Sequence, residues 1–216
     1  MEQRVEFNTE LIKRYDVAGP RYTSYPTAVQ FMEGFDAEAY RRHTDASNNE
    51  LIPKPLSLYV HLPFCKSLCY YCGCMKKVTR HTHQADQYLE LLNREVEMQG
   101  QLFDHDRQVI QLHFGGGTPT FHTDDQLKTL MDVLGTHFSL SREDSREFSI
   151  EVDPRTVGTE RLAVLADMGF NRISLGIQDI HPDVQKAVNR IQDTQSTLDM
   201  IEGSRKLGFN SVSVDL

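Results

Sequence analysis

The chain has 216 residues, of which 39% are hydrophobic and 25% are charged. These values are ordinary for a folded domain, so composition excludes a wholly disordered chain. Lysine and arginine number 23 against 31 aspartate and glutamate, a net charge of −8, and this acidic balance argues against nucleic-acid binding. No apolar run approaches the roughly 18 residues of a membrane span. The N-terminus lacks a signal peptide's apolar core, so we expect a cytoplasmic protein.

Residues 1–50 are predicted to form an N-terminal extension, and residues 51–216 a separate domain. The extension holds an aromatic stretch punctuated by glycine and proline, Gly19-Pro20-Arg21-Tyr22-Thr23-Ser24-Tyr25-Pro26, which is typical of irregular structure. A helix is expected at about Asp36–Thr44, followed by a solvent loop at Ser47-Asn48-Asn49.

Beyond the extension, short β-prone runs alternate with helical patterns. Apolar residues recur at helical spacing from Ala85 to Phe103, from Leu127 to Phe138 and from Leu162 to Met168. Alternation about every 30–40 residues is typical of βαβ units, so we expect an α/β protein with a parallel sheet. The five predicted strands are Leu56–Leu62, Val109–Phe114, Phe148–Val152, Ile173–Ile177 and Ser211–Leu216.

Local signals fix several helix ends. Thr123 and Gln126 have the spacing of a capping box, and Gly169 and Gly208 suit the position just after a helix. Pro182 suits the first position of a helix, which we expect to break near Asp193-Thr194. The sequence stops at Leu216, inside a predicted strand, and we therefore expect it to be the front part of a longer protein.

All four cysteines lie in one short segment, spaced Cys65-x₃-Cys69-x₂-Cys72-x-Cys74. Disulfide frameworks scatter their cysteines, so this spacing indicates a metal or redox site. The first three have room to bind separate irons of a four-iron cluster, whereas only Gly73 separates Cys72 from Cys74. Three ligands and one open iron is the preferred interpretation, and an open coordination site indicates chemistry. A zinc site using all four thiols remains the alternative.

Polar or glycine features follow each of the other predicted strands. In parallel α/β folds functional residues gather at the carboxyl ends of the strands, so these features predict one shared site. The glycines could approach a ligand or simply form a tight turn, and Glu151 could bind an amine or ribose or form a structural ion pair. On their own, Gln178 and Arg190 favour surface roles. The features are Gly115-Gly116-Gly117, Glu151 with Asp153, Gln178 with Asp179, and Asp215.

Two further groups receive structural interpretations. Lys76, Lys77 and Arg80 are expected to form a solvated basic face rather than a partner site. His61 and His113, which flank strands, are expected to serve packing or local hydrogen bonds, and no histidine is assigned to metal.

The ordered combination of the three-cysteine motif, Gly115-Gly116-Gly117-Thr118-Pro119-Thr120 and Glu151-Val152-Asp153-Pro154 resembles the radical S-adenosylmethionine (SAM) superfamily. Within it, the chain is most similar to the N-terminal part of oxygen-independent coproporphyrinogen III oxidases, on the Gly19–Ala28 stretch and the fourth cysteine. The resemblance implies a partial (β/α) barrel of six parallel strands, of which about five are present here. Phe114 and Tyr71 stand where the family pattern has Trp and Phe.

The resemblance implies residue roles that spacing alone does not establish. Cys65, Cys69 and Cys72 would hold a [4Fe-4S] cluster, and Cys74 would be needed for activity without ligating it. A cluster-bound SAM would meet Tyr59, Gly116 and Glu151. A second SAM would meet a larger set, namely Tyr71, Gly117, Thr118, Gln178, Arg190 and Asp215.

The implied activity is anaerobic haem biosynthesis. A 5′-deoxyadenosyl radical made from SAM at the cluster would convert two propionates of coproporphyrinogen III to vinyl groups, giving protoporphyrinogen IX. A flavodoxin- or ferredoxin-like protein would supply the electron, and the protein would be a monomer. The alternative is a haem-binding chaperone on the same scaffold.

Overall fold

The computed structural model describes residues 7–17 and 27–216, so the whole of the predicted Gly19–Pro26 stretch lies outside the described residues. The chain divides into two compact units, Met1–Tyr40 and Arg41–Leu216. Among the described residues, no helix has both the length and the apolar character needed to cross a membrane.

The first unit contains the helix α1 (Thr9–Tyr15), the 3₁₀ turn η1 (Ala28–Gln30) and the start of α2 (Ala37–Asn48). No residue of α1 is buried, and Asn8 caps it by accepting a hydrogen bond from the Leu11 amide. The helix predicted at about Asp36–Thr44 is confirmed as α2, which continues to Asn48, whereas α1 was not predicted. The predicted loop is wrong at Ser47 and Asn48, which end α2.

Asn48 explains this extension of α2. Its side chain donates to the Leu102 carbonyl at 2.9 Å, and it accepts from Arg107 Nη1 at 2.8 Å. These bonds fix the end of α2 within the second unit, a contact that local sequence signals do not reveal.

The second unit is built on a parallel sheet with the strand order β1-β4-β6-β7-β8. The predicted parallel order and all five predicted strands are confirmed, each within two residues at either end. Gly115 and Gly116 belong to β4 because they pair with His61 and Leu62, whereas Ile177 lies beyond β7. The strands are β1 (Leu56–Leu62), β4 (Gln108–Gly116), β6 (Glu147–Val152), β7 (Arg172–Gly176) and β8 (Ser211–Asp215).

Three strands of two residues each were not predicted, because periodicity cannot register so short a run. β5 (Ser139–Leu140) pairs with β4, and β2 (Phe64–Cys65) pairs with β3 (Lys77–Val78) in a separate ribbon. The β2–β3 ribbon brings together the two ends of the segment that contains the cysteines.

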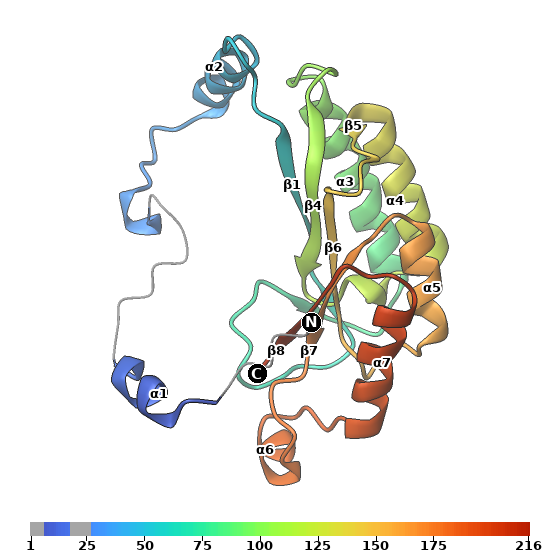
Figure 1. Cartoon of the computed structure of the whole chain (residues 1–216). Coiled ribbons are helices and arrows are strands. Elements are labelled where there is room, and N and C mark those ends of the chain that lie inside the picture. The colour runs from blue at the N-terminus through green and yellow to red at the C-terminus, as the bar shows by residue number, and fades with distance from the viewer. Residues whose placement is uncertain (1–6, 18–26) are drawn as a thin grey trace. The chain divides into compact units, whose positions relative to one another are not determined.

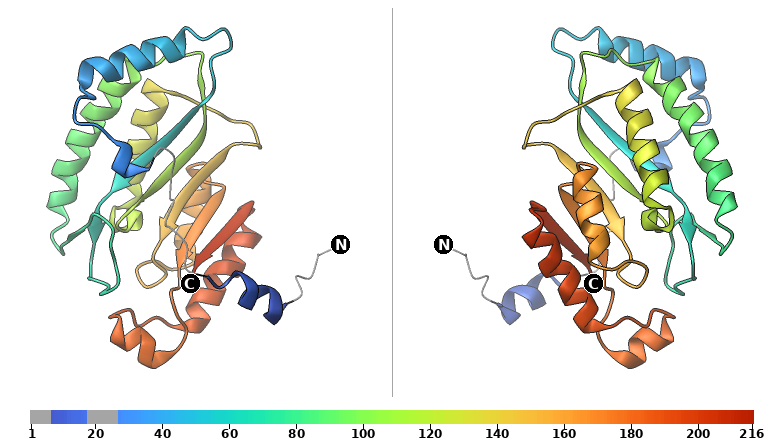
Figure 2. Two further views of the ribbon diagram at one scale, coloured as in Figure 1. Left: turned by 90° about the vertical axis from the view of Figure 1, so that its left-hand side faces the viewer. Right: turned by 90° about the vertical axis from the view of Figure 1, so that its right-hand side faces the viewer.

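The helices α3, α4, α5 and α7 cover one face of the sheet (Figure 1, Figure 2). Phe148, Ile150 and Val152 of β6 are buried in the core, and the alternating Glu147, Ser149 and Glu151 are only partly buried on the opposite face. This alternation follows the strand's period of two. The helices are α3 (His83–Gly100), α4 (Asp124–His137), α5 (Glu160–Asp167), α6 (Pro182–Ala187) and α7 (Thr194–Lys206), with the turn η2 at Pro119–Phe121.

The predicted helix ends are confirmed in most cases. Thr123 and Gln126 form the capping box of α4, and Asp193 caps α7 at the predicted break. Gly169 and Gly208 have φ angles of 98° and 85°, left-handed values that favour glycine after a helix. The exception is Phe103, which lies beyond the end of α3 at Gly100.

His122 is a buried histidine with an unusual environment. Its side chain is 1% exposed and packs edge-on against Phe64. Neither ring nitrogen meets a hydrogen-bond partner within the described ranges. Burial lowers the pKa of His122 to about 4, from an ordinary value of 6.5.

This depressed pKa predicts a loss of stability in mild acid. As pH falls from about 6.5 towards 4, the unfolded state binds a proton that folded His122 does not accept, so the free energy of unfolding falls. At pH 5 we expect His122 alone to lower it by about 2 kcal/mol relative to pH 7.5. Urea unfolding at the two pH values measures the effect.

His122→Phe suits the aromatic neighbours and is expected to remove this part of the pH dependence. The control is His81→Phe, at an exposed position, which is expected to keep it. Equal pH dependence in the parent and in His122→Phe would contradict the prediction.

Candidate functional site

One cavity of about 200 Å³ lies at the carboxyl ends of β4, β6, β7 and β8, and the cysteine loop, residues 65–76, forms its other wall. Strands that end at one edge of a parallel sheet bring sequence-distant residues together there. The predicted shared site is therefore present as a cavity. Of the predicted site residues, Tyr59, Gly115 and Asp179 do not line it. The lining includes Cys65, Cys69, Tyr71, Cys72, Cys74, Gly116, Gly117, Thr118, Glu151, Gln178, Arg190 and Asp215.

The cysteine loop is held closed by backbone hydrogen bonds and by one lysine. The Lys77 amide donates to the Pro63 carbonyl, and the Thr79 amide to the Cys65 carbonyl. Lys76 Nζ donates to the carbonyls of Cys72 at 2.8 Å and Cys74 at 3.3 Å. The predicted solvated role is therefore wrong for Lys76, which lines the cavity.

The four thiols are free and differ in exposure. Cys69 is buried, Cys65 and Cys72 are half-buried, and Cys74 is exposed. Burial raises the pKa of the Cys65 thiol, although the hydroxyl of Thr118, 3.6 Å from Sγ, opposes this by donating to the sulfur. Burial also raises the pKa of Cys74.

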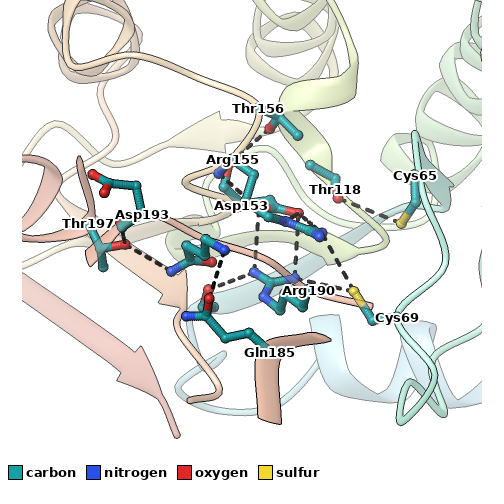
Figure 3. A network of polar contacts seen from close by, with 12 residues as sticks. Cys65, Cys69, Thr118, Asp153, Arg155, Thr156, Gln185, Arg190, Asp193 and Thr197 are labelled. Atoms are coloured by element: carbon teal, nitrogen blue, oxygen red, sulfur yellow. Dashed lines mark hydrogen bonds and ion pairs between the residues drawn. The ribbon is translucent and has the colours of Figure 1, made fainter. Parts of the chain in front are cut away.

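A charged cluster centred on Asp153 lies beside Cys69 of the cysteine loop (Figure 3). The Asp153 carboxylate is nearly buried and forms ion pairs with Arg155 at 2.6 Å and Arg190 at 3.4 Å. Burial alone would raise the pKa of Asp153, but the hydrogen bonds from Arg155 and the charges of both arginines lower it overall. Arg155 and Arg190 each also place a guanidinium nitrogen 3.5 Å from Cys69 Sγ.

The segment after α6 forms hydrogen bonds with the middle of the cysteine loop. The Tyr70 amide donates to the Val188 carbonyl at 3.0 Å, and Asn189 Nδ2 donates to the Leu68 carbonyl at 2.7 Å. Asn189 has a φ of 55°, a left-handed conformation that asparagine tolerates better than most residues. The loop therefore rests on backbone and side-chain contacts from a segment about 120 residues away in sequence.

Glu151 ties two strand ends together on the other side of the cavity. Its carboxylate accepts a hydrogen bond from the Gly116 amide at 3.1 Å and meets His113 Nε2 at 3.1 Å. The local hydrogen bond predicted for His113 is thus present. The Tyr59 ring stacks on His113 with a centroid distance of 5.6 Å, which places Tyr59 beside the cavity.

The glycine run is required by packing as well as by any ligand. Gly116 has a φ of 112°, and a Cβ there would lie 2.6 Å from the His61 ring. A Cβ at Gly117 would lie 2.6 Å from the Pro63 backbone. The close approach of the His61 ring and the Pro63 backbone therefore explains why these two positions are glycine, and both residues also line the cavity.

Gln178 has a strained backbone at the cavity edge. Its φ is 69°, in the left-handed region that glutamine rarely adopts. Its amide donates to the Asp215 carbonyl at 2.7 Å, and so does the Ile177 amide at 3.1 Å. Such backbone strain concentrates at ligand sites, and both Gln178 and Asp215 line the cavity.

The thiols do not have the geometry of a single-ion site. Zinc binds sulfur at about 2.3 Å, so a closed zinc site gathers its ligands around one point. Within residues 7–17 and 27–216, no three His, Cys, Asp or Glu side chains are gathered in this way. Three spaced thiols with hydrogen-bond donors to the sulfurs of Cys65 and Cys69 fit an iron–sulfur cluster, which is larger than one ion.

Sequence reasoning missed Arg155 altogether and did not link His113 to Glu151. A signal for Arg155 was its place two residues after Asp153, at a strand end where carboxylates need partners when buried. The pairing of β4 with β6 places His113 opposite Ser149, two residues before Glu151, and this alignment is not visible without the sheet order.

Comparison with known proteins gives the same family as the motifs. Residues 59–216 match the model of the radical SAM superfamily. An oxygen-independent coproporphyrinogen III oxidase from Pseudomonas aeruginosa is 45% identical over 219 residues, which is 100% of this chain and 46% of the relative. One from Mannheimia haemolytica is 47% identical over 144 residues, covering 67% of this chain and 94% of the relative.

A solved structure of coproporphyrinogen III oxidase from Escherichia coli, described as a radical SAM enzyme, superposes with a TM-score of 0.84 at 44% identity. It covers 99% of this chain and 46% of its own length, so the chain spans about half the length of these longer relatives. The predicted fold is confirmed by this superposition. The superfamily implies a [4Fe-4S] cluster and SAM, which the cavity's thiols and polar lining suit. The chain belongs to the radical SAM superfamily and, within it, to the family of oxygen-independent coproporphyrinogen III oxidases.

Proposed function

We propose that this chain forms the cofactor-binding part of an enzyme that oxidatively decarboxylates two propionates of coproporphyrinogen III to vinyl groups, giving protoporphyrinogen IX in haem biosynthesis. The observation that carries the proposal is the meeting of the cysteine loop, the glycine run and Glu151 at one cavity. This cavity lies in a chain about 45% identical to relatives that carry the enzyme's name.

The ligands proposed for the [4Fe-4S] cluster are Cys65, Cys69 and Cys72. When bound, the cluster and SAM together supply a 5′-deoxyadenosyl radical, the reactive group of this superfamily. The chain's own residues bind, orient and shield these cofactors. Thr118 and the two arginines provide hydrogen bonds to the sulfurs of Cys65 and Cys69, and such bonds from the second shell tune a cluster.

Two SAM sites are proposed in the cavity. Gly116 and Glu151, which already share a hydrogen bond, would hold the cluster-bound molecule together with Tyr59. Arg190 supports a second site, because its Nε is buried and has no hydrogen-bond partner in the described part of the chain, so it remains available to an anionic group. The remaining proposed contacts of the second SAM are Tyr71, Gly117, Thr118, Gln178 and Asp215.

The environment of the enzyme also remains a proposal. We infer from the family resemblance that the protein is a cytoplasmic monomer and takes its electron from a flavodoxin- or ferredoxin-like protein. Lys76 and the exposed Lys77 and Arg80 give the region of the cysteine loop positive charge in an otherwise acidic chain. This charge would attract an acidic donor protein.

The cluster assignment is tested by removing each ligand. Serine in place of Cys65, Cys69 or Cys72 is expected to abolish the cluster, because iron requires the thiolate. Iron and sulfide analysis of anaerobically purified protein, with EPR of the reduced form, measures the loss. Full cluster content in any of the three variants would overturn its assignment as a ligand.

Cys74 provides the matched control, since it lies in the same loop but is exposed. Cys74→Ser is expected to keep near-normal iron and sulfide and to lose decarboxylation of coproporphyrinogen III. Loss of the cluster in this variant would favour a site of four thiols instead.

Glu151 and Gln178 are expected to act on different SAM molecules. Removing a hydrogen bond to a charged ligand group costs about 1.5–3 kcal/mol, or roughly 10- to 150-fold in affinity. Glu151→Gln keeps an oxygen for the Gly116 amide and removes the charge, so we expect weaker binding of the cluster-bound SAM. The measurement is the SAM concentration at the midpoint of a titration followed by the EPR spectrum of the reduced cluster.

Gln178→Asn preserves tolerance of the left-handed backbone while shortening the side chain. We expect it to leave that EPR titration nearly unchanged and to lower the total SAM bound in equilibrium dialysis. If both variants bind SAM as the parent does, the two side chains serve only the fold.

A further inference from the structure

We propose that Arg155 sets the reduction potential of the iron–sulfur cluster through its contact with Cys69, an inference that rests on the proposed cluster ligands. Arg155 lies in the cavity wall at the carboxyl end of β6. Figure 3 shows its guanidinium between the Asp153 carboxylate and the Cys69 sulfur. No sequence motif of the cysteine loop points to it.

The guanidinium of Arg155 is fixed in place. Its Nε donates to both oxygens of Asp153, at 2.9 and 3.2 Å, and its Nη2 donates to Oδ2 at 2.6 Å. Its Nη1 donates to the Asn189 carbonyl at 3.4 Å. These bonds leave Nη2 3.5 Å from Cys69 Sγ, so a positive charge is held against one sulfur.

Arg190 also contacts Cys69, but its guanidinium is hydrogen-bonded to a different strand end as well. Its Nη2 donates to the Gly176 carbonyl at 2.6 Å, and its unpaired Nε is available to a ligand in the cavity. Every guanidinium nitrogen of Arg155, in contrast, is already committed to Asp153, Asn189 or Cys69. Arg155 is therefore the arginine whose charge acts on the sulfur regardless of whether SAM is bound.

The sign of the effect follows from electrostatics. Reduction adds one negative charge to the cluster, and a nearby cation with a hydrogen bond to a ligating sulfur stabilises that reduced form. Arg155 therefore raises the potential. Asp153 has the opposite charge at the same place and lowers it, and its buried carboxylate keeps Arg155 aimed at Cys69. Removal of the two charges is thus expected to shift the potential in opposite directions.

The test is a potentiometric titration of the cluster without SAM, with reduction by dithionite through mediators and EPR detection of the reduced form. Arg155→Gln is expected to lower the ratio of reduced to oxidised cluster about tenfold at a fixed potential, about 59 mV for one electron. Asp153→Asn, of the same shape, is expected to shift the potential upwards. Arg155→Lys keeps the charge and is expected to lie close to the parent.

The control is Arg161→Gln. Arg161 is partly buried and pairs with Asp124, and its hydrogen bonds go to Asp124 and to the carbonyls of Thr120 and His122, not to a thiol. The cluster of this variant is expected to titrate like that of the parent. Should Arg155→Gln fail to hold a cluster, Arg155→Lys and Asp153→Asn decide the question.

The proposal would be overturned if the reduction potential shifted in the same direction in Arg155→Gln and Asp153→Asn, or in neither. Two residues that only support the structure would give no reason for shifts in opposite directions. Failure of the parent to hold a cluster would instead overturn the proposed ligand set. The two failures are therefore distinguishable from cluster content alone.

Discussion

The site depends on the ion pairs that the buried carboxylate of Asp153 forms with two arginines. A nearly buried charge is tolerated only when it is paired and hydrogen-bonded, and removal of one partner of such a pair typically costs about 3–5 kcal/mol. Asp153 meets this need with Arg155 from its own strand end and Arg190 from the segment after α6. Both arginines reach Cys69, so one ion network joins the carboxyl end of β6 and the segment after α6 to the cysteine loop.

The parallel sheet explains why so many polar groups can meet in one place. Each strand uses its alternating residues to bury one face against the helices, and its last residues then emerge at a common edge. At the end of β6, Val152 is buried in the core, while Glu151 before it and Asp153 after it line the cavity. The fold and the site are therefore set by the same strand, and a one-residue slip of register would exchange their roles.

The sequence predicted the parts of this structure that depend on local signals. The short β-prone runs, the capping box of α4 and the glycines after α5 and α7 all act within a few residues. The family resemblance supplied site residues that lie around one cavity. The contact of Arg155 with Cys69 could not be predicted, because the two residues lie 86 positions apart in sequence. The role of Lys76 was missed because its bonds to the Cys72 and Cys74 carbonyls depend on how the cysteine loop folds back on itself. Helix α1, which has no buried residue, was not predicted either.

The hydrogen bond from Asn189 to the Leu68 carbonyl has a consequence for how the protein acquires its cofactor during synthesis. The ribosome makes the four cysteines early, but the residues that hold the middle of their loop follow more than 100 residues later. Contacts of such sequence separation form late, because the intervening chain must first be ordered. For several seconds of translation at roughly 5–20 residues per second, the thiols are present without their support. Cluster loading is therefore expected to follow the folding of α6 and its neighbours, and reactive thiols on the growing chain need protection until then.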